Sequence, residues 1–311
     1  MTNTQIVTQL VFGIALTAGL ALSQKSLPVW EWDFPRIERT VNKIRAGRDL
    51  TPKTWPGGAR VAVALSFDVD TEETGLAWEQ DMASQYEYAA RVGVPRILKL
   101  LERYSIPVTF FIPAVGAQLH PEEVDAILRS PLRHEIGVHG WVHEQIPKLS
   151  PEQERRLTRQ AFEFWTKRLG HKPVGIRTPS WTYSATTLSI IQELGFLYDS
   201  SLMSDDRPYE ILADRKSTGI VEVPVEGITD DYVYYQGLKS ADSAVLATYE
   251  AEFDMAYDEG TLFQLTMHPL VTGHRSRLAV LDQLLAHIKS KPGVWFATHE
   301  QVAQVAKAQM R

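Results

Sequence analysis

The chain has 311 residues, of which 44% are hydrophobic and 23% are charged, a composition ordinary for a globular enzyme with a sizeable core. Its formal net charge of -6, without long basic runs, argues against nucleic acid as a partner, because phosphate binding needs clustered Lys and Arg. The absence of cysteine excludes disulfides and thiolate metal sites. A metal ion would therefore have to be bound by His and carboxylate ligands.

The first 23 residues contain an apolar, uncharged run from Ile6 to Leu22. A run of this length is typical of a signal peptide, although no Lys or Arg precedes it, and an ordinary apolar helix is the alternative. We therefore expect a secreted or periplasmic protein, with a cytoplasmic location as the alternative. Residues 24–58, rich in Trp, Pro and charge, are expected to form a lead-in segment before a main domain at 59–311.

From Arg60 onward, short β-branched or aromatic runs alternate with longer amphipathic segments, a pattern typical of parallel β/α units. One domain of roughly 250 residues suits a closed or nearly closed β/α barrel. Ser150 followed by Pro151 marks the start of one helix, since Ser caps and Pro favours the first helical position. The predicted strands are 60–67, 107–113, 135–138, 175–177, 220–224, 262–267 and 294–297, and the predicted helices include 96–103, 151–169, 185–194 and 278–289.

Polar residues stand at the ends of several predicted strands, where a β/α barrel carries its active site. Asp68 and Asp70 end the first strand, and because strand side chains alternate, both should point to the same face. Two neighbouring carboxylates repel each other and are costly to desolvate unless a cation or a proton compensates them. Three further predicted strands end at His139, Arg177 and His268.

His139 and His143 are four residues apart, and on a helical turn this spacing would place both rings on one face, toward a single cation. An isolated pair of this kind also arises freely in loops. Together with Asp70, the pair forms a possible set of two histidines and one carboxylate that leaves open positions for water and substrate. Asp68 would then be free to act as a base.

Arg177, Asp199 and His268 are consistent with the same cleft, and each also has a structural alternative. Arg177 alone could form an ion pair, Asp199 could begin a loop, and His268 could be a buried core histidine with satisfied hydrogen bonds.

Taken in order, these motifs resemble those of the polysaccharide deacetylases with the NodB homology domain, carbohydrate esterase family 4, over about residues 55–303. Residues 67–70 are similar to the first motif, which supplies a catalytic base and a metal ligand, and residues 139–143 to the second, which supplies two more ligands. Residues 177–181 resemble the third motif, whose Arg steadies the base and whose following residues line the groove. Residues 265–268 resemble the last, whose His is the general acid.

The resemblance implies a distorted (β/α)7 TIM-like barrel and a divalent metal ion, most often zinc, with cobalt, nickel or manganese as alternatives. It also implies three groups of site residues. The catalytic residues are Asp68, Arg177 and His268; the metal ligands are Asp70, His139 and His143; and the candidate substrate-binding residues are Trp141, Pro179, Trp181 and Asp199.

Two departures from the usual motifs matter. Val69 separates two Asp residues that are usually adjacent, and Ser180-Trp181 stands where Tyr-Gly is usual. Both changes resemble the branch that holds atypical peptidoglycan deacetylases together with allantoinase-like and cyclic-imidase-like hydrolases. The metal-binding motif is often degraded in the imidase-like and allantoinase-like members, so its intactness here favours a metal-dependent deacetylase.

We therefore expect a hydrolase of carbon–nitrogen bonds that removes N-acetyl or similar acyl groups from an amino-sugar polymer or oligosaccharide. The alternatives are hydrolysis of a small cyclic imide or ureide, and a carbohydrate-binding homologue without turnover. A non-haem iron oxygenase uses the same ligand types, but its carboxylate usually lies two residues from a His. A homo-oligomer is left open. The aromatic platform of the non-catalytic alternative would comprise Trp141, Trp181, Tyr232, Tyr234 and Tyr235.

Overall fold

The computed structural model describes residues 27–80 and 83–310. The chain separates into two compact units, Met1–Thr40 and Val41–Arg311. In the first unit, the described residues form the 3-10 turn η1 (Val29–Glu31) and most of helix α1 (Phe34–Val41). The predicted signal peptide lies outside the described residues. Among the residues that are described, no helix combines the length and the apolar character needed to cross a bilayer.

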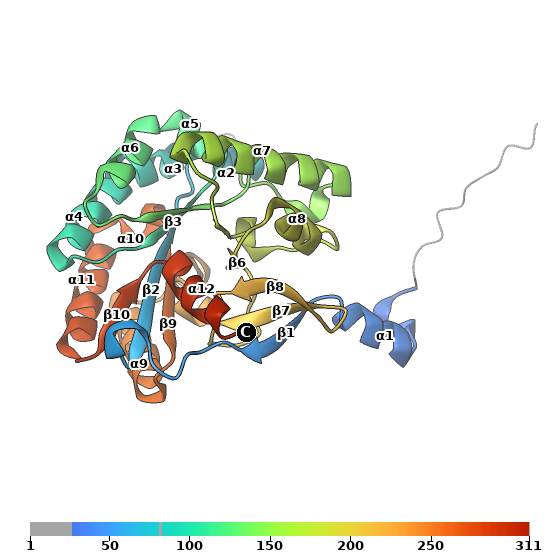
Figure 1. The fold of residues 1–311 in the computed structure, drawn as a ribbon. Helices are drawn as coiled ribbons and strands as arrows, with labels where there is room; N and C mark the ends of the chain where they lie inside the picture. The colour runs from blue at the N-terminus through green and yellow to red at the C-terminus, as the bar shows by residue number, and fades with distance from the viewer. Residues whose placement is uncertain (1–26, 81–82, 311) are drawn as a thin grey trace, which may run out of the picture. The chain divides into compact units, whose positions relative to one another are not determined.

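The larger unit is built on a curled, ten-stranded sheet in which β2 pairs with three other strands, β3, β9 and β10 (Figure 1). Every residue of β2 is buried, as expected for a parallel strand covered on both faces. The strands are β1 (Arg45–Asp49), β2 (Val61–Asp68), β3 (Thr109–Ile112), β4 (Glu135–Val138), β5 (Gly175–Ile176), β6 (Tyr198–Asp199), β7 (Tyr209–Ala213), β8 (Lys216–Glu222), β9 (Leu262–Met267) and β10 (Val294–Ala297).

The predicted distorted (β/α)7 barrel is confirmed. Seven parallel strands run in the order β9, β2, β3, β4, β5, β6 and β8. A single parallel bridge between Asp230 and Thr266 then brings the segment after β8 beside β9. The distortion has two sources. First, β2 has two partners along one edge, because β10 pairs with the first half of β2 and β3 pairs with the second half of β2. Second, β1 and β7 extend the sheet beyond β8 with antiparallel pairing.

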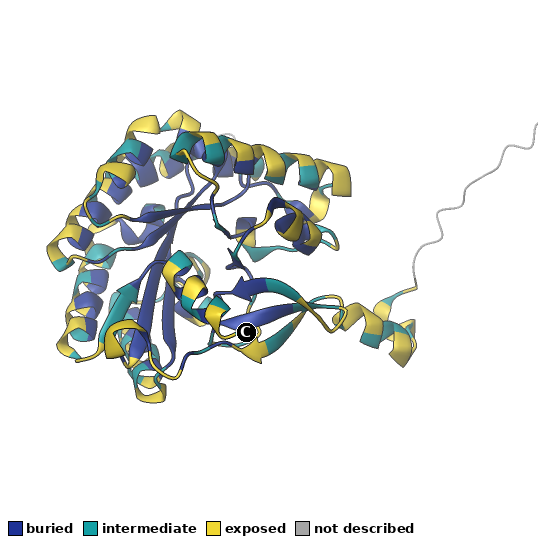
Figure 2. Ribbon diagram, viewed as in Figure 1, coloured by how far each residue is buried: buried dark blue, intermediate teal, exposed yellow. Residues whose placement is uncertain are grey.

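Helices cover the outside of this sheet, with their exposed faces outward and their buried faces on the strands (Figure 2). The predicted helix at 151–169 is confirmed as α7, where Ser150 and Gln153 form a capping box. The helices of the larger unit are α2 (Glu72–Ala77), α3 (Ser84–Tyr88), α4 (Val94–Tyr104), α5 (Ala114–Leu119), α6 (Pro121–Arg129), α7 (Pro151–Leu169), α8 (Thr187–Leu194), α9 (Asp242–Glu259), α10 (Pro269–Thr272), α11 (Arg275–Ser290) and α12 (His299–Ala308), with short 3-10 or π turns at η2 (Pro56–Gly58), η3 (Ala89–Gly93), η4 (Ile146–Lys148), η5 (Pro179–Trp181), η6 (Gly227–Thr229) and η7 (Val233–Gly237).

The other predicted elements differ from the structure mainly at their ends. The strand expected at 107–113 is limited to β3, because α5 begins at Ala114, and the strand expected at 220–224 begins earlier, as β8. Within the lead-in segment, residues 45–49 form β1, which pairs with β7, and Trp55 is buried in a hydrophobic cluster that includes Ala62 and Leu262. The ends of β2, β4, β5, β8 and β9 meet at one end of the barrel and carry the candidate site.

Candidate active site

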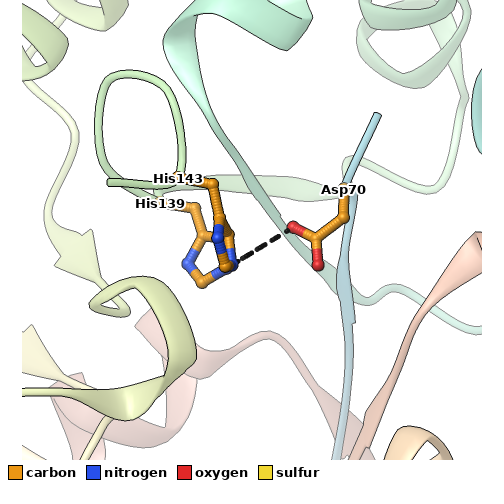
Figure 3. Close-up of side chains that lie close together, drawn as sticks. All are labelled: Asp70, His139 and His143. Atoms are coloured by element: carbon orange, nitrogen blue, oxygen red, sulfur yellow. Dashed lines mark ion pairs between the residues drawn. The ribbon is translucent and has the colours of Figure 1, made fainter. Parts of the chain in front are cut away.

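The first part of the site is a group of two histidines and one aspartate with side chains directed at one another (Figure 3). Asp70 Oδ1 lies 3.8 Å from His139 Nε2 and 3.6 Å from His143 Nε2. Around a tetrahedral ion with bonds of about 2.1 Å, ligand atoms are about 3.4 Å apart, so this spacing suits one metal ion. All three side chains are buried, and Asp70 Oδ1 has no hydrogen-bond partner among the described residues. The group therefore fits a divalent cation.

The two imidazoles are held in the form that binds metal. Burial lowers the pKa of His139, and it lowers the pKa of His143 to about 4, so both rings are neutral near pH 7. His139 Nδ1–H donates to the carbonyl of Arg177 at 2.8 Å, which leaves the lone pair on Nε2 facing Asp70. A ligand histidine whose second nitrogen is fixed in this way is the usual arrangement in metal sites.

Residues 139–143 form a loop rather than a helical turn, and Gly140 and His143 in it have positive φ angles of 75° and 58°. Buried Glu144 organises the loop by accepting hydrogen bonds from the backbone N–H groups of Trp141 and Val142 at 2.8 and 3.0 Å. A Cβ atom at position 140 would lie 2.7 Å from Pro179 Cγ. Glycine is required there, and the rings converge through loop geometry rather than helical spacing.

Asp68 lies beside this group with a different partner. Arg177 Nη1 donates to Asp68 Oδ1 at 2.6 Å, while Asp68 Oδ2 faces His139 Nε2 at 3.9 Å. Burial alone would raise the pKa of Asp68, but the charges of Arg177, His139 and His268 outweigh it and hold that pKa below its usual value. By contrast, burial keeps the pKa of Asp70 above its usual value. The two aspartates therefore share a face but differ in electrostatic environment.

His268 faces the same space from the end of β9. Its ring Nδ1–H donates to Asp231 Oδ1 at 2.8 Å, and its Nε2 lies 4.0 Å from Asp70 Oδ2. Burial alone would lower the pKa of His268, but the hydrogen bond and charge of Asp231, with further charge from Asp230 and Asp68, raise it to about 10. This histidine is therefore cationic near pH 7, unlike His139 and His143.

Sequence reasoning missed Asp230 and Asp231, which follow β8 and come beside β9 through the Asp230–Thr266 bridge. Asp231 is fully engaged, since its carboxylate accepts from the His268 backbone N–H, from His268 Nδ1 and from Thr272 Oγ1. In the sequence, these two residues are recognisable only as an adjacent acidic pair soon after the predicted strand at 220–224. The pair alone does not indicate which strand it will lie beside.

A cavity of about 400 Å³ opens over these groups. Ser180 and Trp181 line one part of it, from a turn in which both have positive φ angles, 52° and 55°. Tyr232 lines another part, with its ring 5.4 Å from that of His268. The lining residues are Asp68, Asp70, Thr74, Trp78, Gln80, Tyr86, His139, His143, Ser180, Trp181, Asp230, Tyr232, Val233 and His268.

The structure does not bring every candidate substrate-binding residue to this cavity. Trp181 lines it, whereas Pro179, the first residue of the same turn, is buried against Gly140. Trp141 packs edge-on against Phe164. Asp199 is fully buried, where it accepts hydrogen bonds from Tyr183 and Ser201.

The chain is similar to proteins described as deacetylases and to an allantoinase. The family model for polysaccharide deacetylase matches residues 58–198. The solved structure of a Mycobacterium smegmatis protein described as a polysaccharide deacetylase is 34% identical, with a TM-score of 0.76, covering 86% of this chain and 96% of that one. Puue allantoinase is 27% identical with a TM-score of 0.74, covering 85% and 98%. The peptidoglycan deacetylase of Helicobacter pylori is 27% identical over an alignment of 280 residues that covers 78% of this chain and 95% of that protein.

Proposed function

The chain belongs to the polysaccharide deacetylase family, and we propose that it is a metal-dependent hydrolase that removes N-acetyl or similar acyl groups from an amino-sugar polymer or oligosaccharide. One observation carries this proposal. A candidate metal-binding group with two neutral imidazoles, an ionised carboxylate and a cationic imidazole line the same 400 Å³ cavity. Amide hydrolysis needs this combination, because water must lose a proton and the departing nitrogen must gain one.

Asp68 is proposed as the base. Its Oδ1 is occupied by Arg177, so Oδ2 is the oxygen available to take a proton from the attacking water. Arg177 keeps the carboxylate ionised and fixes its orientation, and Arg177 is itself held by Ser66 Oγ at 2.9 Å and by the carbonyl of Ser200 at 2.9 Å. The base is thus oriented before substrate binds.

His268 is proposed as the acid. Asp231 holds its Nδ1, so the second ring nitrogen, Nε2, presents a proton to the cavity on the side of Asp70. An amine is a poor leaving group unless it is protonated, and a cationic imidazole at this position can protonate the departing nitrogen.

The ion proposed for Asp70, His139 and His143 is zinc, because two neutral imidazoles and one carboxylate with an open fourth position are typical of catalytic zinc sites. Cobalt, nickel or manganese are the alternatives. A bound divalent ion would polarise the acyl carbonyl and lower the pKa of its water.

The test is a panel assay on metal-analysed protein, comparing N-acetylated mono- and oligosaccharides with cyclic imides and ureides. Asp68→Asn should lose most turnover while keeping its metal. His268→Ala should lose more activity on amides than on activated esters, whose leaving groups depart without a proton. Loss of metal in Asp68→Asn would show that the two aspartates have the opposite roles, and a fully active metal-free protein would refute the mechanism.

Hydrolysis of a small cyclic imide or ureide is the second candidate function. The volume of the cavity lies near the lower end of the range for ligand sites, about 300–1,000 Å³, and the side chains of Trp78 and Tyr86 bound it on the side of α2 and α3. The likeness to Puue allantoinase also supports a compact substrate. Turnover of a cyclic substrate without turnover of any acetylated sugar would favour this candidate. Binding of sugars without turnover of anything would favour the non-catalytic alternative.

Export from the cytoplasm is proposed from the sequence of the first 23 residues alone. Mass spectrometry of the protein from its native host should find that this segment has been removed or that the protein is held at a membrane. A cytosolic protein that retains Met1 would contradict the proposal.

A further inference from the structure

The guanidinium that holds the proposed base has a partner that the mechanism above does not use. An arginine side chain carries five N–H donors. Four of the donors of Arg177 go to Asp68 Oδ1, Ser66 Oγ, the Ser200 carbonyl and Ser200 Oγ. The fifth, on Nη2, faces the ring of His299, with Nη2 and His299 Nε2 3.3 Å apart. Arg177 and His299 are both fully buried, so bulk water does not compete for this donor.

The hydrogen bond between these two side chains has one possible direction. Arg177 has no acceptor, so His299 Nε2 must accept, and the proton of the neutral ring must then be on Nδ1. Burial lowers the pKa of His299 well below its usual value, and the charge of Arg177 lowers it further, so the ring is neutral near pH 7. A neutral acceptor satisfies the guanidinium without adding a second negative charge that would compete with Asp68.

His299 is held in place by the start of α12, which packs against β2 and β8 (Figure 1). It is the first residue of this helix, whose N-cap Thr298 forms a capping box with Gln301. The His299 backbone N–H donates to Thr109 Oγ1 at 2.8 Å. The ring packs edge-on against Phe111, with the two ring centres 5.5 Å apart. The acceptor that faces Arg177 is therefore fixed from both the backbone and the ring.

A fixed acceptor on Nη2 matters for the base on Nη1. The guanidinium is a rigid plane, so its two terminal nitrogens move together. Without a partner for Nη2, Arg177 would tilt toward another acceptor, and Nη1 would shift relative to Asp68 Oδ1, which is 2.6 Å away. The direction of Asp68 Oδ2, the oxygen that takes the proton, depends on that contact. A displacement of about 1 Å at a reacting group can lower a rate by about 100-fold.

We propose that His299 is a positioning residue for the catalytic base: its Nε2 fixes the guanidinium of Arg177, and Arg177 in turn fixes Asp68. The proposal rests on the hydrolase function above and adds a residue to the same site. His299 lies outside the described lining of the cavity, so it acts through Arg177 and not on the substrate. The last helix of the barrel thus contributes to the reaction through two successive buried hydrogen bonds.

Two amide substitutions test whether the acceptor must reach Arg177. In His299→Gln, the amide oxygen can take the place of Nε2 and accept from Nη2, whereas the shorter side chain in His299→Asn reaches only the place of Nδ1. On the substrate that the panel assay identifies, His299→Asn should lose on the order of 10- to 100-fold in kcat, with KM close to that of the wild type. His299→Gln should recover most of this loss.

The matched control is Val302→Ala. Val302 is fully buried on the same helix, in a hydrophobic cluster that includes Trp55 and Val223, and its side chain offers no acceptor to Arg177. The truncation leaves a cavity and loosens α12, so urea unfolding should show a lower midpoint while kcat stays near that of the wild type. A loss of kcat as large as that of His299→Asn would show that a loosened helix explains the effect, and the inference would fail.

Nitrogen-15 NMR of the imidazole rings in the zinc-loaded protein gives a readout that needs no turnover. At pH 7, the wild-type His299 should show a protonated Nδ1 and an unprotonated Nε2, with its signals assigned by their absence in either variant. A protonated Nε2 or a cationic ring would overturn this inference and leave the proposed function standing.

The remaining outcomes also decide. Equal losses of kcat in His299→Asn and His299→Gln, or a loss of bound metal that parallels the loss of activity, would overturn the inference. If the wild-type protein turns over no substrate of the panel, the proposed function fails and the catalytic role of His299 fails with it. The NMR result distinguishes this case from a failure of the contact itself.

Discussion

Replacing Arg177 with Met tests whether the base depends on a single buried cation. Arg177 is fully buried and donates to Asp68 Oδ1, Ser66 Oγ, the Ser200 carbonyl and Ser200 Oγ at 2.6 to 2.9 Å. Its guanidinium also lies 4.1 Å from the centre of the Phe111 ring. Methionine keeps the apolar length of the side chain and removes every donor. The substitution therefore leaves the Asp68 charge buried without its main partner.

Breaking a buried ion pair by removing one member costs about 3–5 kcal/mol, a large part of the approximately 5–15 kcal/mol that stabilises a typical domain. The cost should depend on pH. With Arg177 present, the pKa of Asp68 lies below its usual value, so the pair contributes stability above about pH 4, and this contribution is lost as the pH falls further. Without Arg177, burial dominates and the pKa of Asp68 rises. The deficit of the variant should then shrink as the pH falls and Asp68 is protonated.

The assay is urea unfolding of metal-free protein at pH 7 and at pH 5, with metal-loaded turnover measured across pH. Arg207→Met is the matched control, because Arg207 pairs with Asp205 and Asp49 but its side chain is 42% exposed. Exposed pairs contribute about 0–1 kcal/mol, so the control should unfold near the wild type. The reasoning is refuted if Arg177→Met stays within about 1 kcal/mol of the wild type at pH 7, or if its deficit grows toward pH 5.

Three further substitutions probe other parts of the site. His143→Ala should lower bound metal and activity together, which metal analysis beside the turnover assay would check; full metal occupancy would exclude His143 as a ligand. Gly175→Ala would place a Cβ atom 2.0 Å from the Tyr198 ring, so unfolding should show a loss of at least about 1–3 kcal/mol, and an unchanged melting temperature would contradict the packing. Asp231→Asn should lower the pKa of His268 from about 10, so the alkaline loss of activity should move to lower pH. In metal-free wild-type protein, the Asp231–His268 pair stabilises the fold fully below about pH 6.5, and this stabilisation is lost as the pH rises toward 10. The variant should lack this pH-dependent stabilisation.

Local signals in the sequence predict the elements that depend on local interactions. The helix at 151–169 was predictable because Ser150, Pro151 and an amphipathic run all lie within it or beside it. The strands at 135–138, 262–267 and 294–297 are short apolar runs bounded by polar residues, and the structure confirms each of them. In these cases no distant partner is needed to identify the element.

Elements defined by distant pairing escaped prediction. β1 has the sequence Arg-Ala-Gly-Arg-Asp, which carries no strand pattern, and it is a strand only because β7 lies beside it. β6 consists of two residues, whose pairing with β5 and β8 places them in the sheet. α9 has apolar residues on several faces, so its periodicity is weak, although it packs against both α11 and β9.

The residues of the site also divide into those that local sequence predicts and those whose arrangement depends on distant contacts. The motif residues Asp68, Asp70, His139 and His143 could be selected from the sequence because their residue types and spacing are informative. The loop that joins the two histidines could not be, since its conformation depends on Glu144 and on Pro179 packed over Gly140. Two histidines at i and i+4 can converge in more than one backbone geometry. Their spacing therefore predicted that the two rings meet, but not the loop that brings them together.

The roles of these groups follow from their partners more than from their residue types. Asp68 and Asp70 are two residues apart and both buried, but Arg177 lowers the pKa of Asp68, while burial raises that of Asp70. His143 and His268 are both buried, but the pKa of His143 falls to about 4, while Asp231 helps to raise that of His268 to about 10. Titratable pairs whose pKa values are driven apart in this way can divide acid, base and ligand roles between identical side chains. The deciding partners, Arg177 and Asp231, follow β5 and β8, so the chemistry is assigned only once the fold brings these segments beside β2 and β9.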